Sequence, residues 1–128
     1  MNSKTEILNK INEILKQSTS NVLIVVPELK DIENIPFYEI KASTSIRIAC
    51  IVNSFEFFDE LDSLDNIKIR SYERKDRYGI IRDNEELFLA IPGEDHNNFL
   101  TFYTDDLSHI KVVNTLITEC WIRGTIVE

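Results

Sequence analysis

Glycine, proline and cysteine are scarce in this 128-residue chain, which contains three glycines, three prolines and two cysteines. So little glycine and proline excludes a flexible linker or a low-complexity tract, and the length suits one hydrophobic core. Cys50 and Cys120 lie in apolar segments and lack CxxC spacing. This pattern predicts two reduced core cysteines, with neither a disulfide nor a zinc site.

Positive charge and long apolar runs are also in short supply. The chain has 14 Lys and Arg against 22 Asp and Glu, so its formal net charge is −8. Such a charge repels phosphate backbones at long range, which argues against direct nucleic-acid binding. The opening segment, MNSKTEILNKINEILKQ, is interrupted by Lys and Glu, so it is neither a signal peptide nor a membrane span. We therefore expect a cytoplasmic protein without membrane contact.

The first half of the chain alternates between helical and strand-like patterns. A β-branched run, Val22–Val26, is typical of a central strand that is covered on both faces. The expected elements, in order, are a helix over 3–17, a strand over 22–26, a broken helix within 28–45, a strand over 46–52, and a helix over 55–64 capped by Asn53 and Ser54.

The second half begins with short strand patterns separated by polar turns. Strands are predicted over 67–72, 78–82, 87–91 and 99–103, and a final helix runs from Leu107 to a stop at Gly124. This order predicts an α/β fold, with a mixed β-sheet and helices packed on it, as a single domain over residues 1–128.

The order of these elements resembles one lobe of a phospholipase D-like domain. The segments that carry the resemblance are VLIVVPEL, IRIACIVNS, YGIIRDNEELFLA and the final helix ending in CW. They are especially similar to the degenerate, non-catalytic version that forms the sensor part of archaeal TrmB-type transcriptional regulators. In those regulators the domain follows a winged-helix module. Here the first helix leads directly into a strand, so we expect no separate DNA-binding module.

In active members of that superfamily the chemistry lies on an H-x-K-x4-D motif. Alignment on IIRDNEELFLA puts Asp76 in place of the His and Tyr78 in place of the Lys, and only Asp83 matches. A carboxylate beside a phenol offers no cation for a phosphodiester, so we expect no enzymatic activity. The literal His-x-Lys at His109 and Lys111 lies in a helical pattern, where residues two apart diverge.

The resemblance also implies a ligand site at the carboxyl ends of the strands. Its candidate residues are Asn53, Ser54, Asp76, Tyr78 and Asp83. Each has a structural interpretation too, as a helix cap, a turn residue or a packed ring. His96, in the loop PGEDHNN, has no third convergent ligand for a metal. We expect neither a metal nor another cofactor.

The stretch IKIRSYERKDRYGIIR has an unusual charge. It holds six basic and two acidic residues, 6 − 2 = +4, in a chain of net charge −8. An anion or an acidic partner is one interpretation, and the solvent face of an edge strand is the other. The candidate binding residues are Lys68, Arg70, Arg74, Lys75 and Arg77.

Three functions stay open at this stage. The first is a sensor domain, with a possible role in transcription, that binds a small molecule or a partner protein. The second is a structural module that only self-associates, and the third is a cryptic phosphodiesterase. Because phospholipase D-like domains resemble halves of a two-lobed unit, we expect a homodimer that buries apolar residues around Phe99, Phe102 and Trp121.

Overall fold

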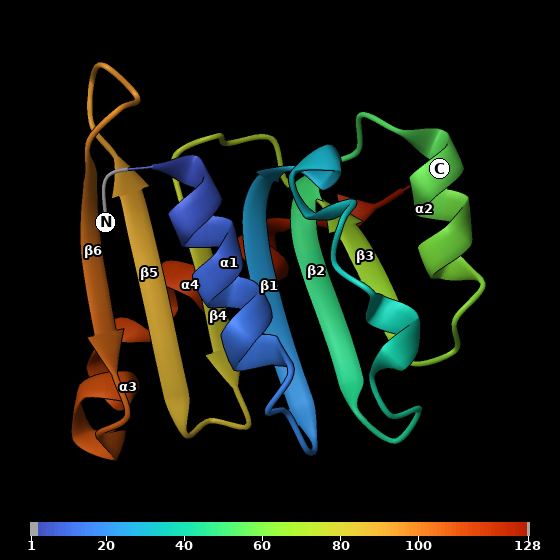
Figure 1. The fold of residues 1–128 in the computed structure, drawn as a ribbon, viewed down its shortest axis with the longest axis horizontal. Coiled ribbons are helices and arrows are strands. Elements are labelled where there is room, and N and C mark those ends of the chain that lie inside the picture. The colour runs from blue at the N-terminus through green and yellow to red at the C-terminus, as the bar shows by residue number, and fades with distance from the viewer. Residues whose placement is uncertain (1–2, 128) are drawn as a thin grey trace.

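The computed structural model describes residues 3–127, which form a seven-stranded sheet with helices on both faces (Figure 1). The strand order is β6-β5-β4-β1-β2-β3-β7. The strands are β1 (Asn21–Glu28), β2 (Ser45–Ile51), β3 (Ile67–Ser71), β4 (Tyr78–Arg82), β5 (Glu86–Pro92), β6 (Phe99–Thr104) and β7 (Thr125–Ile126).

The sheet is mixed, as the sequence predicts. β1, β2 and β3 run parallel, whereas β4 pairs antiparallel with β1 and continues through β5 to β6 as an antiparallel meander. The central strand β1 is buried from Val22 to Pro27, which explains its uninterrupted apolar run. At one end of the sheet the carboxyl end of β1 lies beside the start of β4, and the carboxyl end of β2 lies on the other side of β1.

One face of the sheet is covered by α1 (Lys4–Leu15), two short 3₁₀ helices, η1 (Leu29–Ile32) and η2 (Phe37–Glu39), and α2 (Phe55–Asp62). Ser3 and Ser54 cap α1 and α2, and their side chains accept hydrogen bonds from the backbone N–H groups of Glu6 and Phe57. We call this side the front face. Its core includes the buried α1 residues Ile7, Ile11, Ile14 and Leu15.

The back face is covered by α3 (Leu107–Val113) and α4 (Thr115–Arg123), which pack on β1, β4 and β5 through Ile110, Ile117 and Cys120. The sequence predicts one final helix, but the chain forms two that meet at Asn114. The prediction for the cysteines is confirmed, since Cys50 and Cys120 are both buried and free. None of the helices within residues 3–127 has the length and apolar content needed to span a bilayer.

Candidate functional site

A cavity of about 220 Å³ opens where β1 ends and β4 begins. We call it the Tyr78 pocket, because Tyr78 is the first residue of β4 and lies in its wall. The lining residues come from α1, from the ends of the four strands β1, β4, β5 and β6, and from two loops. They are Lys4, Pro27, Glu28, Lys75, Tyr78, Pro92, His96 and Phe99.

The Tyr78 ring is 6% exposed and packs edge-on against Phe99, with 5.9 Å between ring centroids and 73° between ring planes. Burial raises the pKa of Tyr78, and the negative charges of Asp31 and Glu28 act in the same direction. At neutral pH the wall of the pocket therefore contains a neutral phenol.

Charges of both signs surround this phenol. The Lys4 ammonium lies 2.6 Å from an Asp31 carboxylate oxygen, and this hydrogen bond raises the pKa of Lys4. Lys75 lies 3.5 Å from Glu28, and Glu28 also accepts a hydrogen bond from the Asn53 amide. Each lysine thus has a carboxylate partner, and the pocket suits a small polar molecule better than a highly charged anion.

The structure brings only part of the expected five-residue site to this pocket. Tyr78 lines it, and Asn53 lies one contact away, through Glu28, where it also accepts the Lys30 backbone N–H at 3.1 Å. Ser54 caps α2 and faces a different hollow. Asp76 does not line the pocket, because Arg77 binds both of its carboxylate oxygens, at 2.9 and 3.1 Å.

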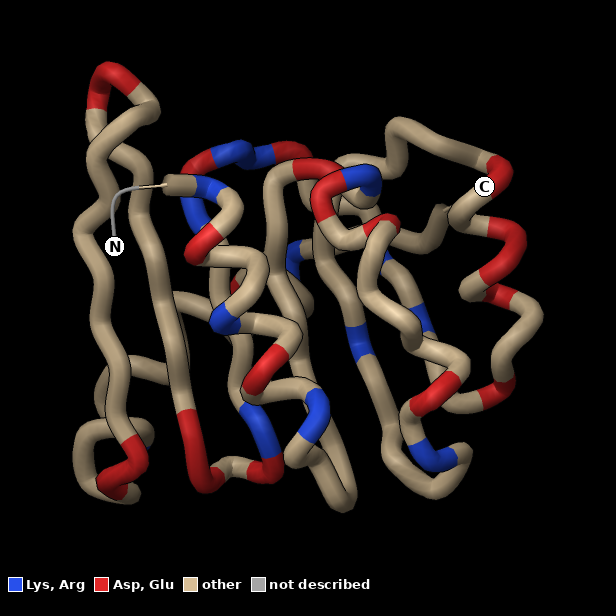
Figure 2. The backbone as a smooth tube through the Cα atoms, in the orientation of Figure 1, with Lys and Arg blue, Asp and Glu red and all other residues tan. Residues whose placement is uncertain are grey.

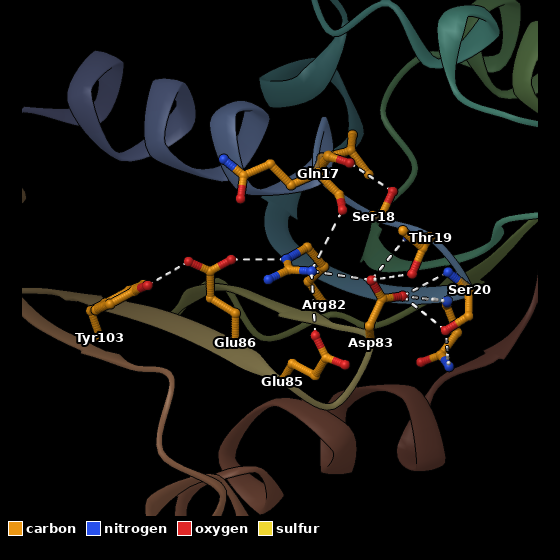
Figure 3. A network of polar contacts seen from close by, with 11 residues as sticks. Gln17, Ser18, Thr19, Ser20, Arg82, Asp83, Glu85, Glu86 and Tyr103 are labelled. Atoms are coloured by element: carbon orange, nitrogen blue, oxygen red, sulfur yellow. Dashed lines mark hydrogen bonds and ion pairs between the residues drawn. The ribbon is translucent and has the colours of Figure 1, made fainter.

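Asp83 lies at the opposite end of β4, which corrects its placement in the site. Its carboxylate accepts backbone N–H groups of Thr19, Ser20 and Asn21 at 2.8 to 2.9 Å, so it ties the β4–β5 turn to the start of β1 (Figure 3). These hydrogen bonds lower the pKa of Asp83, although burial opposes them. Asp83 lies five positions after Tyr78 along an extended strand, and that distance alone keeps them apart.

A polar network continues from Asp83 across the sheet (Figure 3). Arg82 contacts Asp83 at 3.2 Å and Glu86 at 2.8 Å, and Glu86 accepts a short hydrogen bond from the Tyr103 hydroxyl. That hydrogen bond raises the pKa of Tyr103 to about 12. Because these groups satisfy one another, we interpret this end of the sheet as structural.

The basic stretch divides into two groups. Arg74, Lys75 and Arg77 lie in the loop before β4, and each contacts a carboxylate. Lys68 and Arg70 instead alternate with Ile67 and Ile69 on β3 and belong to the back face. The five residues therefore do not form one binding edge.

Sequence reasoning did not assign Lys4, Glu28 and Phe99 to a ligand site. It placed Phe99 in an apolar dimer surface and considered His96 only as a metal ligand. These residues are separated by up to 95 positions, from Lys4 to Phe99. Each belongs to a pattern that already has a structural explanation, such as a helix start or a strand end. Only the arrangement of the strands brings them together.

Comparisons with known proteins identify similar folds among solved structures. No protein-family model matches the sequence, and a comparison with curated proteins gives no match. Among solved structures, NucT from Helicobacter pylori is 14% identical over 97% of this chain and 92% of its own, with a TM-score of 0.64. Nuc from Salmonella typhimurium, a phospholipase D family member, is 11% identical over 94% and 88%, with a TM-score of 0.56. The chain has the phospholipase D-like fold.

The present chain is also similar to the archaeal chromatin protein TrmBL2. The likeness covers 99% of the present chain, with 14% identity and a TM-score of 0.77. The chain spans about half of TrmBL2, 53% of that protein. This likeness agrees with the resemblance to TrmB-type domains. At 14% identity, the likeness shows a shared fold but does not show shared site residues.

The same comparison overturns the expectation about nucleic acid. TrmBL2 is described as showing a novel mode of DNA binding, which contradicts our inference from the sequence that direct nucleic-acid binding does not suit this domain. The physical error lies in the use of net charge. A total of −8 averages over the whole surface, whereas phosphate contacts depend on the local arrangement of Lys and Arg.

Proposed function

We propose that this chain is a non-enzymatic regulatory domain of the phospholipase D-like type, which binds a small polar ligand in the Tyr78 pocket. The observation that carries the proposal is a cavity at the start of β4, where the resemblance places the H-x-K pair, lined by Tyr78 instead of the lysine. The likeness to TrmBL2 supports a role in transcription or chromatin, since that protein is a chromatin protein.

The protonation states of the substituted residues support binding without turnover. Arg77 holds the Asp76 carboxylate through two hydrogen bonds and lowers its pKa, so this carboxylate stays ionised and engaged. Burial raises the pKa of Tyr78, so its hydroxyl stays protonated and is a weak nucleophile. His96, the side chain of the pocket wall that matches the usual nucleophile of the superfamily in type, lies on an exposed loop.

The lining also limits the class of ligand. A volume of about 220 Å³ admits a molecule of metabolite size. Phe99, Pro27 and Pro92 offer apolar contact, and the Tyr78 hydroxyl, Lys4 and Lys75 offer hydrogen-bond donors. We expect a compact molecule with several oxygen acceptors, such as a sugar or a small carboxylic acid.

A thermal-shift screen with sugars, nucleotides and carboxylic acids tests this proposal. A ligand raises the melting temperature in proportion to the logarithm of its concentration, because it binds only the folded chain. Tyr78→Phe keeps the ring against Phe99 and removes one hydrogen bond, so affinity falls about tenfold. Tyr38→Phe is the control, since Tyr38 is 77% exposed and lies outside the pocket.

Two results would count against the proposal. One is a ligand whose affinity is the same in Tyr78→Phe and in the wild type. The other is hydrolysis of bis(4-nitrophenyl) phosphate by the wild type that disappears in His96→Asn or Asp76→Asn, which would establish a phosphodiesterase.

Self-association is a second candidate function, favoured by the edge strand β6. The segment Phe99–Thr104 carries no charged residue or proline that would protect a sheet edge. Leu100, Phe102 and Tyr103 are 71%, 40% and 47% exposed. Phe99 and Trp121, which the sequence analysis placed in the same apolar surface, are partly buried against the two cores.

Leu100→Lys is expected to convert a dimer to a monomer, because it puts a charge at the middle of an apolar edge. Light scattering with size-exclusion chromatography at about 50 μM reads the mass directly. Val112→Lys is the matched control, because Val112 is 76% exposed on α3. A wild-type monomer at that concentration would remove this second function.

A further inference from the structure

The back face of β2 and β3 carries a group of cations around the tryptophan of α4. Arg47 and Lys68 are paired neighbours on the two strands, and Arg70 lies two residues beyond Lys68. Arg47, Arg70 and the Trp121 ring are in direct contact, with the guanidinium carbons 5.5 and 4.2 Å from the ring centroid. We call Arg47, Lys68, Arg70 and Arg123 the back-face cations.

Arg123 belongs to this group through the end of α4. It is exposed and precedes Gly124, whose position is so close to β3 that an added Cβ would lie 2.9 Å from the Arg70 Cβ. The chain then pairs with β3 as β7, through Ile126 beside Arg70. Four cations thus lie on one side of the sheet, over three neighbouring elements.

Carboxylates are missing from the strands of this surface. β2, β3 and β7 contain no Asp or Glu, and Figure 2 shows Lys and Arg spaced along β2 and β3 without acidic positions in either strand. The acidic residue of α4, Glu119, lies 2.6 Å from Arg77 and is therefore engaged elsewhere. Asp65 and Glu73 lie beyond the two ends of β3. Within residues 3–127, the strands of this surface thus carry basic and no acidic side chains, in a chain of net charge −8.

The contacts of Trp121 indicate how these cations are held. Arg70 stacks on the ring and donates one hydrogen bond to the Trp121 carbonyl oxygen at 2.8 Å, which fixes the guanidinium and leaves its other N–H groups free to donate. Because Arg70 already covers the ring, Trp121 does not offer a free platform for a nucleobase. Fixed guanidinium groups on an open strand surface suit phosphate oxygens.

We propose that the back-face cations form a binding surface for the phosphate backbone of double-stranded DNA, without base recognition. Two features favour a polyanion of regular charge over a single phosphate. Lys68 and Arg70 are about 6.6 Å apart along the strand, and Arg47 extends the row sideways by one strand, so the cations are spread along the sheet surface and not gathered at one point. The surface is separate from the Tyr78 pocket, which opens at the end of the sheet.

Fluorescence anisotropy with a labelled 24-base-pair duplex tests this surface, in a salt titration from about 50 to 200 mM. Contacts with about three to four phosphates give a slope of log K against log salt near −3. Lys68→Gln with Arg123→Gln removes two cations, and we expect about tenfold weaker binding at 50 mM and a slope that is smaller by about two. Lys16→Gln with Lys41→Gln is the control pair, since both residues are exposed outside the back face.

Trp121 provides an independent readout, because it is the only tryptophan of the chain. Its fluorescence should change in step with anisotropy when the unlabelled duplex is added, and inorganic phosphate at the same charge concentration should leave it unchanged. Equal losses in the two variant pairs, or an absence of binding at 50 mM salt, would overturn the proposal. Tighter binding of poly-L-glutamate than of DNA would overturn it in favour of an acidic protein partner.

Discussion

Asp83→Ala is expected to lower the free energy of unfolding by about 3 kcal/mol and the melting temperature by roughly 10 °C. The Asp83 side chain is 4% exposed and accepts three backbone hydrogen bonds from residues 19–21, in addition to its contact with Arg82. Its removal leaves these three backbone donors without their acceptor and takes one of the carboxylate partners from Arg82, which keeps its contact with Glu86. Urea unfolding at pH 7 measures the change.

Two further variants separate the causes. Asp83 has a positive φ of 53°, which Asn tolerates better than Ala. Asp83→Asn therefore keeps the turn and one acceptor oxygen, while it removes the charge and replaces the second oxygen with an NH₂ donor. We expect it to recover part of the loss. Asp59→Ala is the surface control, since Asp59 is exposed on α2, and it should change stability by less than about 0.5 kcal/mol. A loss as small in Asp83→Ala as in Asp59→Ala would contradict the structural role.

The contribution of Asp83 should also depend on pH in a defined direction. The folded state lowers the pKa of Asp83, so its stabilisation is complete above the unfolded value, about 3.9, and decreases as pH falls toward the folded value. The difference in unfolding free energy between wild type and Asp83→Asn is therefore largest near pH 7 and smaller at pH 3. A difference that grows in acid would contradict this assignment.

Arg77→Met is expected to cost about 2 to 3 kcal/mol. Arg77 is 12% exposed and joins the start of β4 to α4, through Asp76, Glu119 at 2.6 Å and the Leu116 carbonyl oxygen at 2.7 Å. Methionine replaces the aliphatic part of the side chain but removes the guanidinium, so Glu119 and the Leu116 carbonyl oxygen lose this donor and Asp76 keeps only its 3.5 Å contact with Arg74. Thermal and urea unfolding measure the loss.

Arg74→Met is the matched control for this prediction. Arg74 lies in the same loop and contacts the same carboxylate at 3.5 Å, but it is 61% exposed, so its removal should change stability by less than about 0.5 kcal/mol. Equal losses of stability in the two variants would show that Arg77 is an ordinary surface cation, and that its contacts with Asp76, Glu119 and Leu116 do not stabilise the fold.

The fold was largely predictable because its signals are local. The β-branched run of β1, the serine caps of α1 and α2 and the polar turns between β4, β5 and β6 each determine one element. The break at Asn114 and the two-residue strand β7 were missed. Both arise from tertiary contacts, since Ile110 and Ile117 on either side of the break are buried against the sheet and β7 pairs with β3 for two residues.

The candidate site was predictable only in part, because residues on one strand were treated as neighbours in space. Tyr78 and Asp83 belong to one motif in the sequence, yet they lie at opposite ends of β4 and have different roles. The prediction of one binding edge along the basic stretch was wrong for a related reason. Lys68 and Arg70 lie on the face covered by α4, whereas Arg77 forms ion pairs with Asp76 and Glu119.

The back-face cations are distant in the sequence and become neighbours only in the folded chain. Arg47 is a single basic residue in an apolar strand, and nothing in its own segment links it to Lys68 or Arg123. Parallel pairing of β2 with β3 puts Arg47 beside Lys68, and the end of α4 adds Arg123. A local positive surface can therefore exist in a chain whose total charge is −8.

Native mass spectrometry of the chain with the ligand found in the screen tests the central claim most directly, because one spectrum reads both binding and turnover. The account predicts one intact ligand per chain in the wild type, with its mass unchanged after incubation, and a strongly reduced complex in Tyr78→Phe. A ligand that is recovered as hydrolysis products, or a complex that is equally abundant in Tyr78→Phe, would contradict a non-enzymatic domain that binds its ligand in the Tyr78 pocket.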